Sequence, residues 1–310
     1  MLPPVDIIIV NWNSGILLSE CIHSISHTIQ NSFILNKVVV IDNASSDNSL
    51  NNLNNTNLPL TIIRNTQNLG FAKACNQGAK NSEADFLLFL NPDTRLFKSS
   101  LVEPIKFMMD QENNEVGIIG VQMVDDENNI SRTCSRFPSP FVFVYMSLGL
   151  NRIFPNIFRN QFMTEWDHNN SQVVDQVMGA FFFVRKNLFQ KLNGFDEKFF
   201  VYFEEVDFSI RAKQINYKSY FLATAKIYHK GGGTSEKVKA DRLFYLLNSK
   251  LLFTKKHFSR VTFTVIALTT IFIEPFVRIL GALLKGSVSE SLEIIKGYKK
   301  LLVNRLCKLE

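Results

Sequence analysis

One segment of the sequence constrains the fold more than any other. An apolar run over residues 84–90 stops abruptly at Asn91, Pro92 and Asp93. Its length and composition are those of a strand buried on both faces of a sheet. Because ligands of open α/β sheets bind at the carboxyl ends of the strands, an acid at this position faces the binding crevice. The segment therefore predicts an α/β fold with Asp93 at its ligand-binding edge.

Short β-branched runs alternate with segments of helical periodicity through the first hundred residues. Such alternation is typical of parallel strands joined by helices. Residues 1–100 are therefore predicted to form a nucleotide-binding half. The predicted strands cover residues 5–10, 37–41, 60–63 and 85–90, and the predicted helices cover residues 16–29 and 70–80.

The pattern continues less regularly over residues 101–235, which we expect to complete the same domain. Residues 138–166 are rich in aromatic residues and interrupted by proline without a clear period, so a mobile loop is predicted there. The predicted helices cover residues 99–112, 186–192 and 204–213, the predicted strands cover residues 116–124, 173–185 and 218–227, and residues 125–129 form a polar turn.

Composition indicates a folded chain in a reducing compartment. The chain has 310 residues, of which 46% are hydrophobic, enough for one large domain with an appendage. Its four cysteines lie far apart without a Cys-x-x-Cys pair, and the first residues lack the basic and apolar regions of a signal peptide. We therefore expect free thiols and a cytoplasmic setting.

The net charge of +6 is unevenly distributed along the chain. Residues 1–235 carry 20 Lys and Arg against 22 Asp and Glu, or −2, whereas residues 236–310 carry 14 against 6, or +8. A nucleic-acid-binding protein would have its basic residues along the binding face. A nearly neutral body with a basic, apolar tail instead predicts an anionic membrane surface as partner and no nucleic acid.

The tail is predicted to be helical, with one helix over residues 241–257 and an apolar segment after it. The apolar residues 261–273 are too few to cross a bilayer, which needs roughly 20 residues. A longer count to Leu284 is interrupted by Glu274, Pro275 and Arg278. Flanking basic residues favour a helix that lies at the membrane surface, as a peripheral anchor on the cytoplasmic side. A packed soluble element and a true span are the alternatives.

Polar residues follow the second predicted strand and precede the helix at 70–80. Asp42 and Asn43 begin a polar turn that can accept hydrogen bonds from a base or ribose, or merely cap the next helix. Gly70 stands at the entrance of the predicted helix, with Ala72 and Asn76 on one face. Small residues there admit a ring or phosphate, or else allow close packing of helix and sheet. No GxGxxG pattern occurs, which excludes a dinucleotide fingerprint.

Asp93 is the candidate metal ligand of the crevice. Mg²⁺ or Mn²⁺ that holds a diphosphate takes one or two protein carboxylates and completes its shell with phosphate and water. The alternative is a turn residue after Pro92. His229 ends a predicted strand before Lys230 and three glycines, a flexible run suited to closing over a phosphate. We expect His229 to be a metal ligand or phosphate contact, although a single histidine is more often structural.

Glu205 is the candidate general base. Glu204, Glu205 and Asp207 begin a predicted helix and cannot all share one face. Asp207 and Arg211 form an i,i+4 pair that we interpret as structural. Glu205 projects elsewhere, and nearby aromatic residues are expected to raise its pKa. A solvated, acidic start of a helix is the alternative.

Several short motifs, in order, resemble the family 2 glycosyltransferases, and especially their rhamnosyltransferase-like branch. The resemblance covers about residues 5–235, and it depends on the order and spacing of the motifs because none is specific alone. The motifs are Ile-Val-Asn-Trp-Asn at 9–13, Asp-Asn-Ala-Ser-Ser-Asp at 42–47, Asn-Leu-Gly-Phe-Ala at 68–72, Leu-Asn-Pro-Asp at 90–93, Gly-Ala at 179–180, Gly-Phe-Asp-Glu-Lys-Phe-Phe at 194–200, Glu-Glu-Val-Asp at 204–207 and His229.

The resemblance implies a GT-A fold: a mixed central sheet flanked by helices, with a nucleotide-binding half at 1–100, an acceptor-binding half at 101–235 and a helical, membrane-associating tail at 236–310. Asp93 matches the last acid of the family's metal-binding DXD motif, and Glu205 matches its catalytic base. Asn91 departs from the first acid of DXD, and Glu205 from the commoner Asp. The residues implied in nucleotide-sugar binding are Val10, Asn11, Asn13, Asp42, Asn43, Asn68, Gly70, Asn76, Asn91 and Asp93; Gly179, Ala180 and Glu204 are implied in acceptor binding.

The implied activity is an inverting, metal-dependent transfer of a sugar from a nucleoside diphosphate to a hydroxyl of a lipid-linked saccharide, as in O-antigen or capsule synthesis. The branch favours dTDP-rhamnose as the donor, and a UDP-hexose is the alternative. Because Asn91 replaces the first acid of the DXD motif, a protein that binds the nucleotide sugar without catalytic turnover is a further alternative. A nucleotidyltransferase shares the α/β core but carries a basic phosphate loop, whereas residues 11–15 contain no Lys or Arg. A membrane scaffold would need no acids at strand ends.

Overall fold

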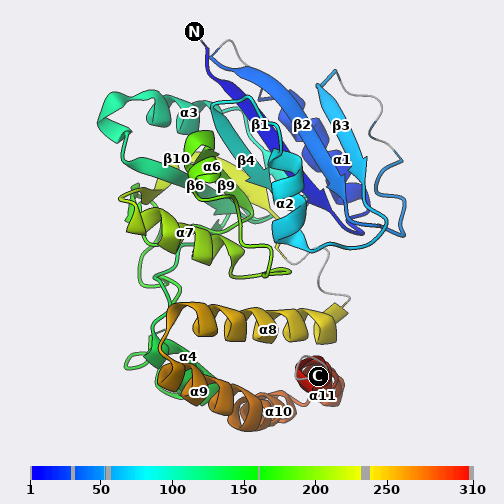
Figure 1. The fold of residues 1–310 in the computed structure, drawn as a ribbon, viewed down its shortest axis with the longest axis vertical. Coiled ribbons are helices and arrows are strands. Elements are labelled where there is room, and N and C mark those ends of the chain that lie inside the picture. The colour runs from blue at the N-terminus through cyan, green and yellow to red at the C-terminus, as the bar shows by residue number, and fades with distance from the viewer. Residues whose placement is uncertain are drawn as a thin grey trace. The chain divides into compact units, whose positions relative to one another are not determined.

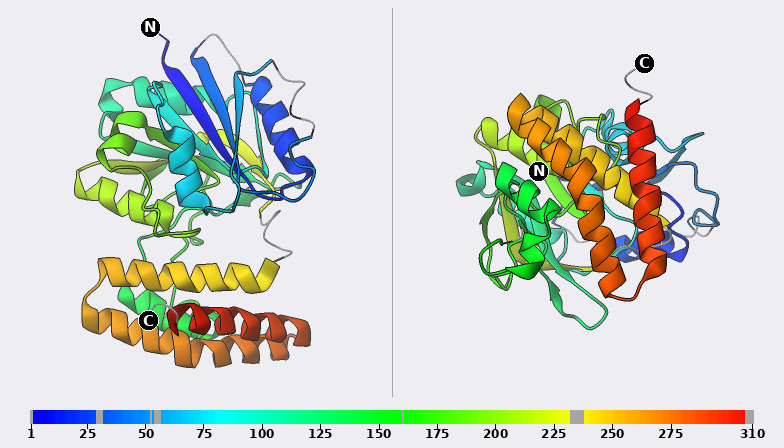
Figure 2. Two further views of the ribbon diagram at one scale, coloured as in Figure 1. Left: turned by 45° about the vertical axis from the view of Figure 1, so that its right-hand side comes forward. Right: turned by 90° about the horizontal axis from the view of Figure 1, so that it is seen from below.

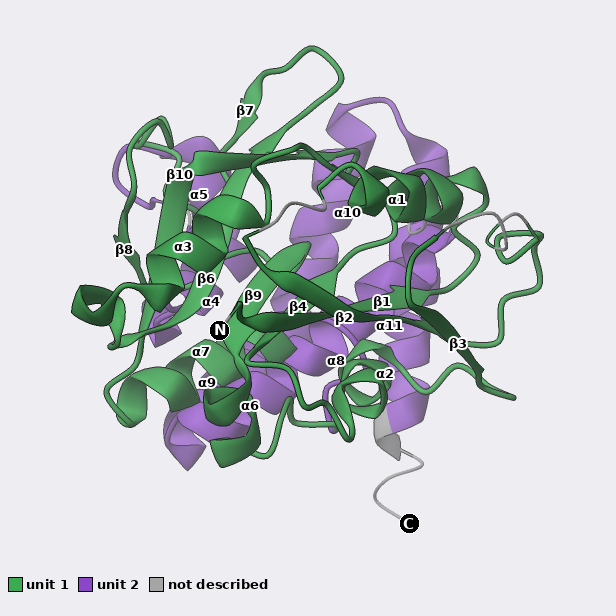
Figure 3. Cartoon of the chain, turned by 90° about the horizontal axis from the view of Figure 1, so that it is seen from above, with its two compact units in different colours: residues 1–136, 162–197, 204–234 green, residues 137–161, 198–203, 235–310 purple. Residues whose placement is uncertain are grey.

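The computed structural model describes residues 2–28, 32–51, 53, 57–159, 161–231 and 238–306. It divides into two compact units, shown in two colours in Figure 3. The first, here called the catalytic unit, contains Met1–Arg136, Phe162–Glu197 and Glu204–Thr234. The second, here called the helical unit, contains Phe137–Gln161, Lys198–Phe203 and Ser235–Glu310. This division differs from the expected one because two internal segments join the C-terminal helices.

The catalytic unit is built on one mixed sheet of ten strands (Figure 1). Eight strands follow the order β3-β2-β1-β4-β9-β6-β10-β5, and β7 and β8 pair with β6 and β10. The strands are β1 (Pro4–Asn11), β2 (Ile34–Asp42), β3 (Leu60–Arg64), β4 (Phe86–Leu90), β5 (Thr94–Leu96), β6 (Val116–Val124), β7 (Ile130–Ser131), β8 (Gln172–Val174), β9 (Phe181–Arg185) and β10 (Lys218–His229).

Alternate residues of the strands bury apolar side chains on opposite faces of the sheet. In β1, Ile7 and Ile9 belong to one core and Ile8 and Val10 to the other, as the two-residue repeat of a strand requires. Figure 3 shows α1 and α2 on opposite sides of the strands. The first core includes α1 (Ile16–Ser26) and α3 (Val102–Met109), and the second includes α2 (Phe71–Ala79), α6 (Lys186–Lys191) and α7 (Glu204–Gln214). The unit is therefore a three-layer α/β/α fold.

Strand direction places the ends of β1, β2, β4 and β10 along one edge of the sheet. β1 pairs in parallel with β2 and β4, with Asn11 opposite Asp42. β9 runs antiparallel to both β4 and β6, while β6 and β10 are parallel. The carboxyl end of β10 therefore lies at the same edge as the carboxyl end of β4. That edge is where ligands bind in open α/β sheets.

Several local predictions differ from the structure. Residues 173–185 form two strands, β8 and β9, rather than one, and the short strand β5 follows directly after Asp93. The mobile loop predicted at 138–166 is wrong for residues 140–153, which form α4 (Pro140–Ser147) and α5 (Leu150–Ile153). Ser139 caps α4 by accepting a hydrogen bond from the Val142 amide, and Pro140 occupies the first helical turn, where its missing amide costs nothing.

The helical unit contains α4, α5 and the C-terminal helices. These are α8 (Lys239–His257), α9 (Arg260–Leu268), the π-helical turn η3 (Thr269–Ile273), α10 (Glu274–Leu284) and α11 (Val288–Leu306). The core of the unit contains Leu247 and Leu251 of α8, Ala282 of α10, and Ile294, Tyr298 and Leu301 of α11. α8, α10 and α11 thus share one apolar core of their own.

The helix continues through the residues that interrupt the apolar run, because α9, η3 and α10 form one helix over Arg260–Leu284. Pro275 begins α10, and Glu274 is buried among partners. Lys250 of α8 donates to Glu274 at 2.7 Å, Ser147 of α4 donates at 2.9 Å, and Arg278 donates at 2.8 Å one turn later. The acid therefore ties three helices together from within an apolar stretch.

Candidate active site

The nucleotide half of the edge is organised by Asn11 and Asp42. Both are buried, and the Asn11 amide donates to Asp42 at 2.8 Å across the paired ends of β1 and β2. The same amide nitrogen contacts the hydroxyls of Ser45 and Ser49, at 3.1 and 2.8 Å. Val10 precedes Asn11 in β1 and packs into the second core. Asp42 is thus oriented by a neutral donor that leaves its charge in place.

The loops after β1 and β2 hold each other through short polar side chains. The Asn13 amide donates to the Ser45 hydroxyl at 3.0 Å, and the Asn13 side chain accepts from the Ser46 amide at 2.8 Å. The Gly15 amide donates to Asp47 at 2.8 Å. Burial opposes ionisation of Asp47, but hydrogen bonds from Ser49 and Gly15 outweigh it and lower the pKa of that carboxyl. The serines that hold these two loops together were not among the predicted site residues.

Asn43, Asn68 and Gly70 shape the entrance of α2. The Asn43 side chain donates to the Gly70 carbonyl at 3.1 Å, and the Gly70 amide donates to the Asn68 side chain at 2.9 Å. Gly70 has a φ of 86°, a conformation that favours glycine. The expected position of these residues beside Asp42 agrees with the structure, because Asn43 follows Asp42 directly and reaches the start of α2.

Asn76 is placed differently from the expected nucleotide contact. Its side-chain amide donates to the Phe195 carbonyl and accepts from the Phe195 amide, both at 2.9 Å. A Cβ atom at Gly194, whose φ is +71°, would lie 2.4 Å from the Asn76 oxygen. Both ends of this amide are therefore engaged in fixing the turn before α7. We correct its role to that of a structural tie.

Asp93 and His229 come together as expected from the sequence. The Oδ1 atom of Asp93 lies 3.5 Å from Nε2 of His229, and both side chains are largely buried. The pairing follows from topology, because β5 turns back along β10 and sets Thr94 opposite His229. The Lys230 amide donates to the Asp93 carbonyl at 3.1 Å, which fixes the corner. The run expected to close over a phosphate continues into residues 232–235, which lie outside the described residues.

A chain of contacts connects Asp93 to Glu205 along the same edge. The Asn91 amide, two residues before Asp93, donates to the Ala180 carbonyl at 3.0 Å. Beside Ala180, the Cβ position of Gly179 would lie 3.7 Å from Cγ and 3.9 Å from Cδ of Glu205. The Glu205 side chain thus passes directly over a residue without a side chain. The end of β4, the start of β9 and the start of α7 meet here.

Glu204 and Glu205 carry carboxyl oxygens that are buried and unpaired. Oε2 of each has no hydrogen-bond partner within the part of the chain that the structure describes. Burial raises the pKa of Glu205, and burial together with the charge of Glu205 raises the pKa of Glu204 further. Burial is the cause that raises the pKa of Glu205, and the aromatic surroundings expected for it stay a prediction. Two adjacent carboxyls therefore hold protons more tightly than free glutamates do.

α7 is fixed to the body of the unit by Arg211. Its guanidinium donates to Asp207 at 2.7 Å, to the Leu192 carbonyl at 2.8 Å and to the Gly194 carbonyl at 2.9 Å. The structural interpretation of the Asp207–Arg211 pair is therefore confirmed. Tyr202 and Phe203, just before α7, both have positive φ, at 69° and 70°. Such backbone is strained for residues with large side chains, and clusters of it are typical of functional sites.

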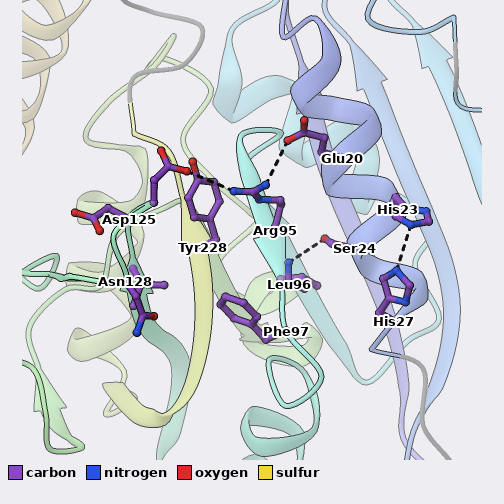
Figure 4. A pocket seen from close by; sticks show the side chains of 12 residues that line it. Glu20, His23, Ser24, His27, Arg95, Leu96, Phe97, Asp125, Asn128 and Tyr228 are labelled. Atoms are coloured by element: carbon purple, nitrogen blue, oxygen red, sulfur yellow. Dashed lines mark hydrogen bonds and ion pairs between the residues drawn. The ribbon is translucent and has the colours of Figure 1, made fainter.

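A separate cavity of about 660 Å³ lies over α1, β5 and the ends of β6 and β10 (Figure 4). In it, Arg95 stacks on the Tyr228 ring at 3.8 Å and pairs with Glu20 and Asp126. Tyr228 and His229 are consecutive in β10, so their side chains point to opposite faces of the sheet. This cavity is lined by residues other than the expected site residues, and sequence patterns gave no signal for it.

The fold is that of solved glycosyltransferases. The mannosyltransferase PcManGT from Pyrobaculum calidifontis, in complex with GDP-Man and Mn²⁺, gives a TM-score of 0.57 at 15% identity, with 97% of this chain and 88% of that chain covered. Residues 1–349 of TarS from S. aureus, in complex with UDP-GlcNAc, give a TM-score of 0.55 at 16% identity, covering 95% and 79%. These likenesses define the class of fold, a GT-A glycosyltransferase.

The sequence comparison identifies the family. The model of glycosyl transferase family 2 matches residues 6–192, and the chain belongs to that family. The rhamnosyltransferase WbbL of Escherichia coli K12 is 27% identical over 192 residues, which are 58% of this chain and 68% of that protein. The hexosyltransferase Agl10 of Haloferax volcanii, which acts in low-salt glycan biosynthesis, is 25% identical over 220 residues, covering 70% and 64%.

A third relative is the N-acetylglucosaminyl-diphospho-decaprenol L-rhamnosyltransferase of Mycobacterium tuberculosis H37Rv. It is 23% identical over 206 residues, which are 62% of this chain and 66% of that protein. The chain thus matches about two thirds of the length of these relatives.

Proposed function

We propose that this glycosyltransferase inverts the anomeric centre as it moves a sugar from a nucleoside diphosphate to a hydroxyl of a lipid-linked saccharide. One observation carries the proposal. A half-buried carboxyl with a raised pKa, Glu205, and a paired acid and histidine, Asp93 and His229, occupy one edge of one sheet. A base and a site for a leaving diphosphate on the same edge are what an inverting transfer needs.

Glu205 would act as the general base. It would take the proton of the acceptor hydroxyl as that oxygen attacks the anomeric carbon on the face opposite the leaving group. Inversion needs one such base, and the raised pKa of Glu205 brings its basicity closer to neutral pH. Gly179 has no side chain where it packs against Glu205, and the acceptor hydroxyl would approach the carboxyl beside it.

Asp93 and His229 would hold the diphosphate end of the donor through Mg²⁺ or Mn²⁺. A carboxylate and an imidazole 3.5 Å apart fit a cation that takes its remaining ligands from phosphate and water. Among the described residues, no group of three or more His, Cys, Asp and Glu could hold a metal ion. The bound cation would supply neutralisation of the charge on the departing phosphate. Asn91 contributes its backbone amide to the Ala180 carbonyl.

The donor is proposed to be dTDP-rhamnose, with a UDP-hexose as the alternative. Two relatives named as rhamnosyltransferases support the first, and the relative named as a hexosyltransferase supports the second. Asp42, held by Asn11, would contact the base or ribose at the nucleotide end of the crevice. Val10, Asn13, Asn43, Asn68 and Gly70 would shape that end.

The acceptor is proposed to be a saccharide on a polyprenyl diphosphate at the cytoplasmic face of a membrane. A relative named for a decaprenol-linked substrate and the basic, apolar tail support this. Glu204, Gly179 and Ala180 would lie on the acceptor side. The product would enter a cell-envelope polysaccharide such as O-antigen or capsule.

A transfer assay tests the proposal. The full chain would be incubated with labelled dTDP-rhamnose or UDP-hexoses, with Mn²⁺, Mg²⁺ or EDTA, and with membrane lipid extract as the acceptor source. We expect label in the organic phase with one donor and a metal ion. Binding of a nucleotide sugar by calorimetry without any product would indicate a non-catalytic binding module. Failure to bind any nucleotide sugar would refute the proposal.

A further inference from the structure

The helix over Arg260–Leu284 carries a continuous apolar stripe on its exposed side. The opposite side of the helix is buried in the helical unit, through Ile266, Thr270, Glu274 and Ala282. Large apolar side chains are exposed at intervals of three or four residues, which places them on one face. They are Val261, Val265, Leu268, Phe272, Phe276, Leu280 and Leu283, with Ile273 and Leu284 beside them.

A second stripe lies on α11. Val288, Leu292, Ile295 and Leu302 are exposed, whereas Ser291, Ile294, Tyr298 and Leu301 are buried in the core of the unit. Figure 2, in its right-hand view, shows α10 and α11 next to each other. The two helices are joined by the short turn between Leu284 and Val288. We call the exposed sides of α9, α10 and α11 the outer face.

The outer face is unusual for a surface in water. Phe272 is 62% exposed and Phe276 is 72% exposed, and only 17% of the most apolar window of the helix is buried. Soluble monomers rarely expose apolar patches that extend over several helical turns, and such patches mark sites of contact with a protein or a lipid. Phe141 of α4, in the same unit, is also 80% exposed.

The charge around the outer face indicates lipid. Residues 236–310 carry 14 Lys and Arg against 6 Asp and Glu. Exposed basic side chains accompany the helices of the outer face: Arg260 at the start of α9, Lys285 just after α10, and Lys299 within α11. Basic residues beside an apolar face are typical of helices that lie in the headgroup region of an anionic bilayer.

Buried Glu274 determines how the helix over Arg260–Leu284 can lie relative to a membrane. The helix has 25 residues and contains an 18-residue window with a mean hydropathy of 1.8, so it is long and apolar enough to cross a bilayer. Glu274, at its middle, accepts from Lys250 of α8 and Ser147 of α4. To cross the bilayer alone, the helix would leave α8 and α4 and expose an acid in hydrocarbon. Within the folded helical unit, Glu274 is hydrogen-bonded on the inner side of the helix, and the apolar side chains face outward.

We infer that the helical unit is a monotopic membrane anchor, whose outer face lies in an anionic bilayer with α9, α10 and α11 parallel to its surface. The inference deepens the proposed function by naming the face and the mode of binding, and it depends on that proposal only for the lipid-linked acceptor. The Lys250–Glu274–Arg278 network keeps the outer face turned outward.

Flotation with vesicles tests the anchor. The full chain would be mixed with vesicles of phosphatidylcholine alone or with an equal part of phosphatidylglycerol. We expect binding to the anionic vesicles that weakens with salt. Replacing both Phe272→Ser and Phe276→Ser should lower partitioning at least about tenfold, because each buried aromatic side chain contributes to insertion. The matched control, Phe97→Ser with Met109→Ser, removes exposed apolar side chains of the catalytic unit and should bind as the parent does.

Depth measurements distinguish a helix that lies parallel to the membrane surface from a helix that crosses the bilayer. Single substitutions Val261→Trp, Phe272→Trp and Leu284→Trp would be quenched by lipids brominated at different depths, with the signal of the parent subtracted. An anchor parallel to the surface predicts the same shallow depth for all three. A span predicts Phe272→Trp near the bilayer centre and the other two near the interfaces, and that result would overturn the inference.

Two further outcomes would also overturn it. If the protein binds nucleotide sugar normally but binds neither kind of vesicle, the membrane anchor is refuted. The proposed function is unaffected by that result. A dimer in sedimentation that becomes a monomer in the Phe272→Ser, Phe276→Ser variant, with no vesicle binding by either, would assign the outer face to a second copy. Circular dichroism of each variant would verify folding. Vesicle binding without nucleotide-sugar binding would instead support the anchor and refute the proposed function.

Discussion

The Oδ1 atom of Asp93 lies 3.5 Å from Nε2 of His229, although Asp93 lies between β4 and β5 and His229 ends β10. The pair forms because β5, which begins immediately after Asp93, reverses along the end of β10. Its geometry leads to a first prediction.

Replacing Asp93→Asn or His229→Gln should weaken binding of the nucleotide sugar in the presence of Mn²⁺. Charge-assisted contacts contribute roughly 1.5–3 kcal/mol, so each loss should raise Kd by about 10- to 100-fold. In EDTA the variants and the parent should bind alike, because the pair would then have no cation to hold. Calorimetry with dTDP-rhamnose and UDP-sugars measures the Kd in Mn²⁺ and the Kd in EDTA. Equal metal dependence in parent and variants would exclude the pair as the metal site.

Replacing Glu205→Gln should lower the transfer rate by about 10²- to 10⁴-fold, the usual contribution of a general base. Nucleotide-sugar affinity should not change, because this residue acts on the acceptor. In the parent, the rate should rise with pH through a pKa above 4.5, since the base must be ionised and burial raises the pKa. Steady-state rates over pH measure this. Glu83→Gln, an exposed residue of the same unit, is the control. A Glu205→Gln enzyme of full activity would disprove the assignment.

Replacing Glu204→Gln should stabilise the protein at neutral pH. Burial and the charge of Glu205 raise the pKa of Glu204 above 4.5, so between the unfolded and folded pKa values the folded state binds more protons than the unfolded state. The contribution of protonated Glu204 to the free energy of unfolding is therefore complete below the unfolded pKa. It is lost as the pH rises through the folded pKa. Melting temperatures of the variant and the parent should converge at acid pH and separate near neutrality. Equal separation at all pH values would indicate a packing effect instead.

Replacing Gly194→Ala should destabilise the catalytic unit by about 1–3 kcal/mol through backbone strain, and further through the contact of the new Cβ with Asn76. Gly231→Ala is a matched control, because its φ is +69° and nothing lies within 4 Å of its Cβ position. Urea unfolding should show the larger loss for Gly194→Ala. Adding Asn76→Ala should recover part of the difference if the clash is the cause.

Most of the parallel strands could be predicted from the sequence, because β1, β4, β6 and the second half of β2 are buried and are mostly apolar. The direction of β9 could not, since an apolar run carries no sign of which way it pairs. The helix α4 was missed because its residues, Pro140–Ser147, are almost all apolar and show no helical period. β-Branched and aromatic side chains there favour extended structure locally.

The candidate site was predicted in outline from residues at strand ends, where polar side chains interrupt apolar runs. The placement of Asn76 was not, because its partner, the backbone of Phe195, is distant in sequence and carries no chemical signature. Glu274 was read only as an interruption of the apolar run, and its burial among partners was not predicted, for the same reason. Lys250, which satisfies it, lies on another helix, and buried ion pairs leave no pattern that a single segment can show.

The antiparallel pairing of β4 with β9 places the start of β9 beside the end of β4. The nucleotide end is formed by loops that leave parallel strands, and those strands fix the register of one another. The Gly179–Ala180 corner instead belongs to a loop that enters β9, so its length can vary without shifting β1, β2 or β4. Under the proposed function, new sequence grafted between β8 and β9 would change which alcohol is glycosylated while the same activated sugar is kept.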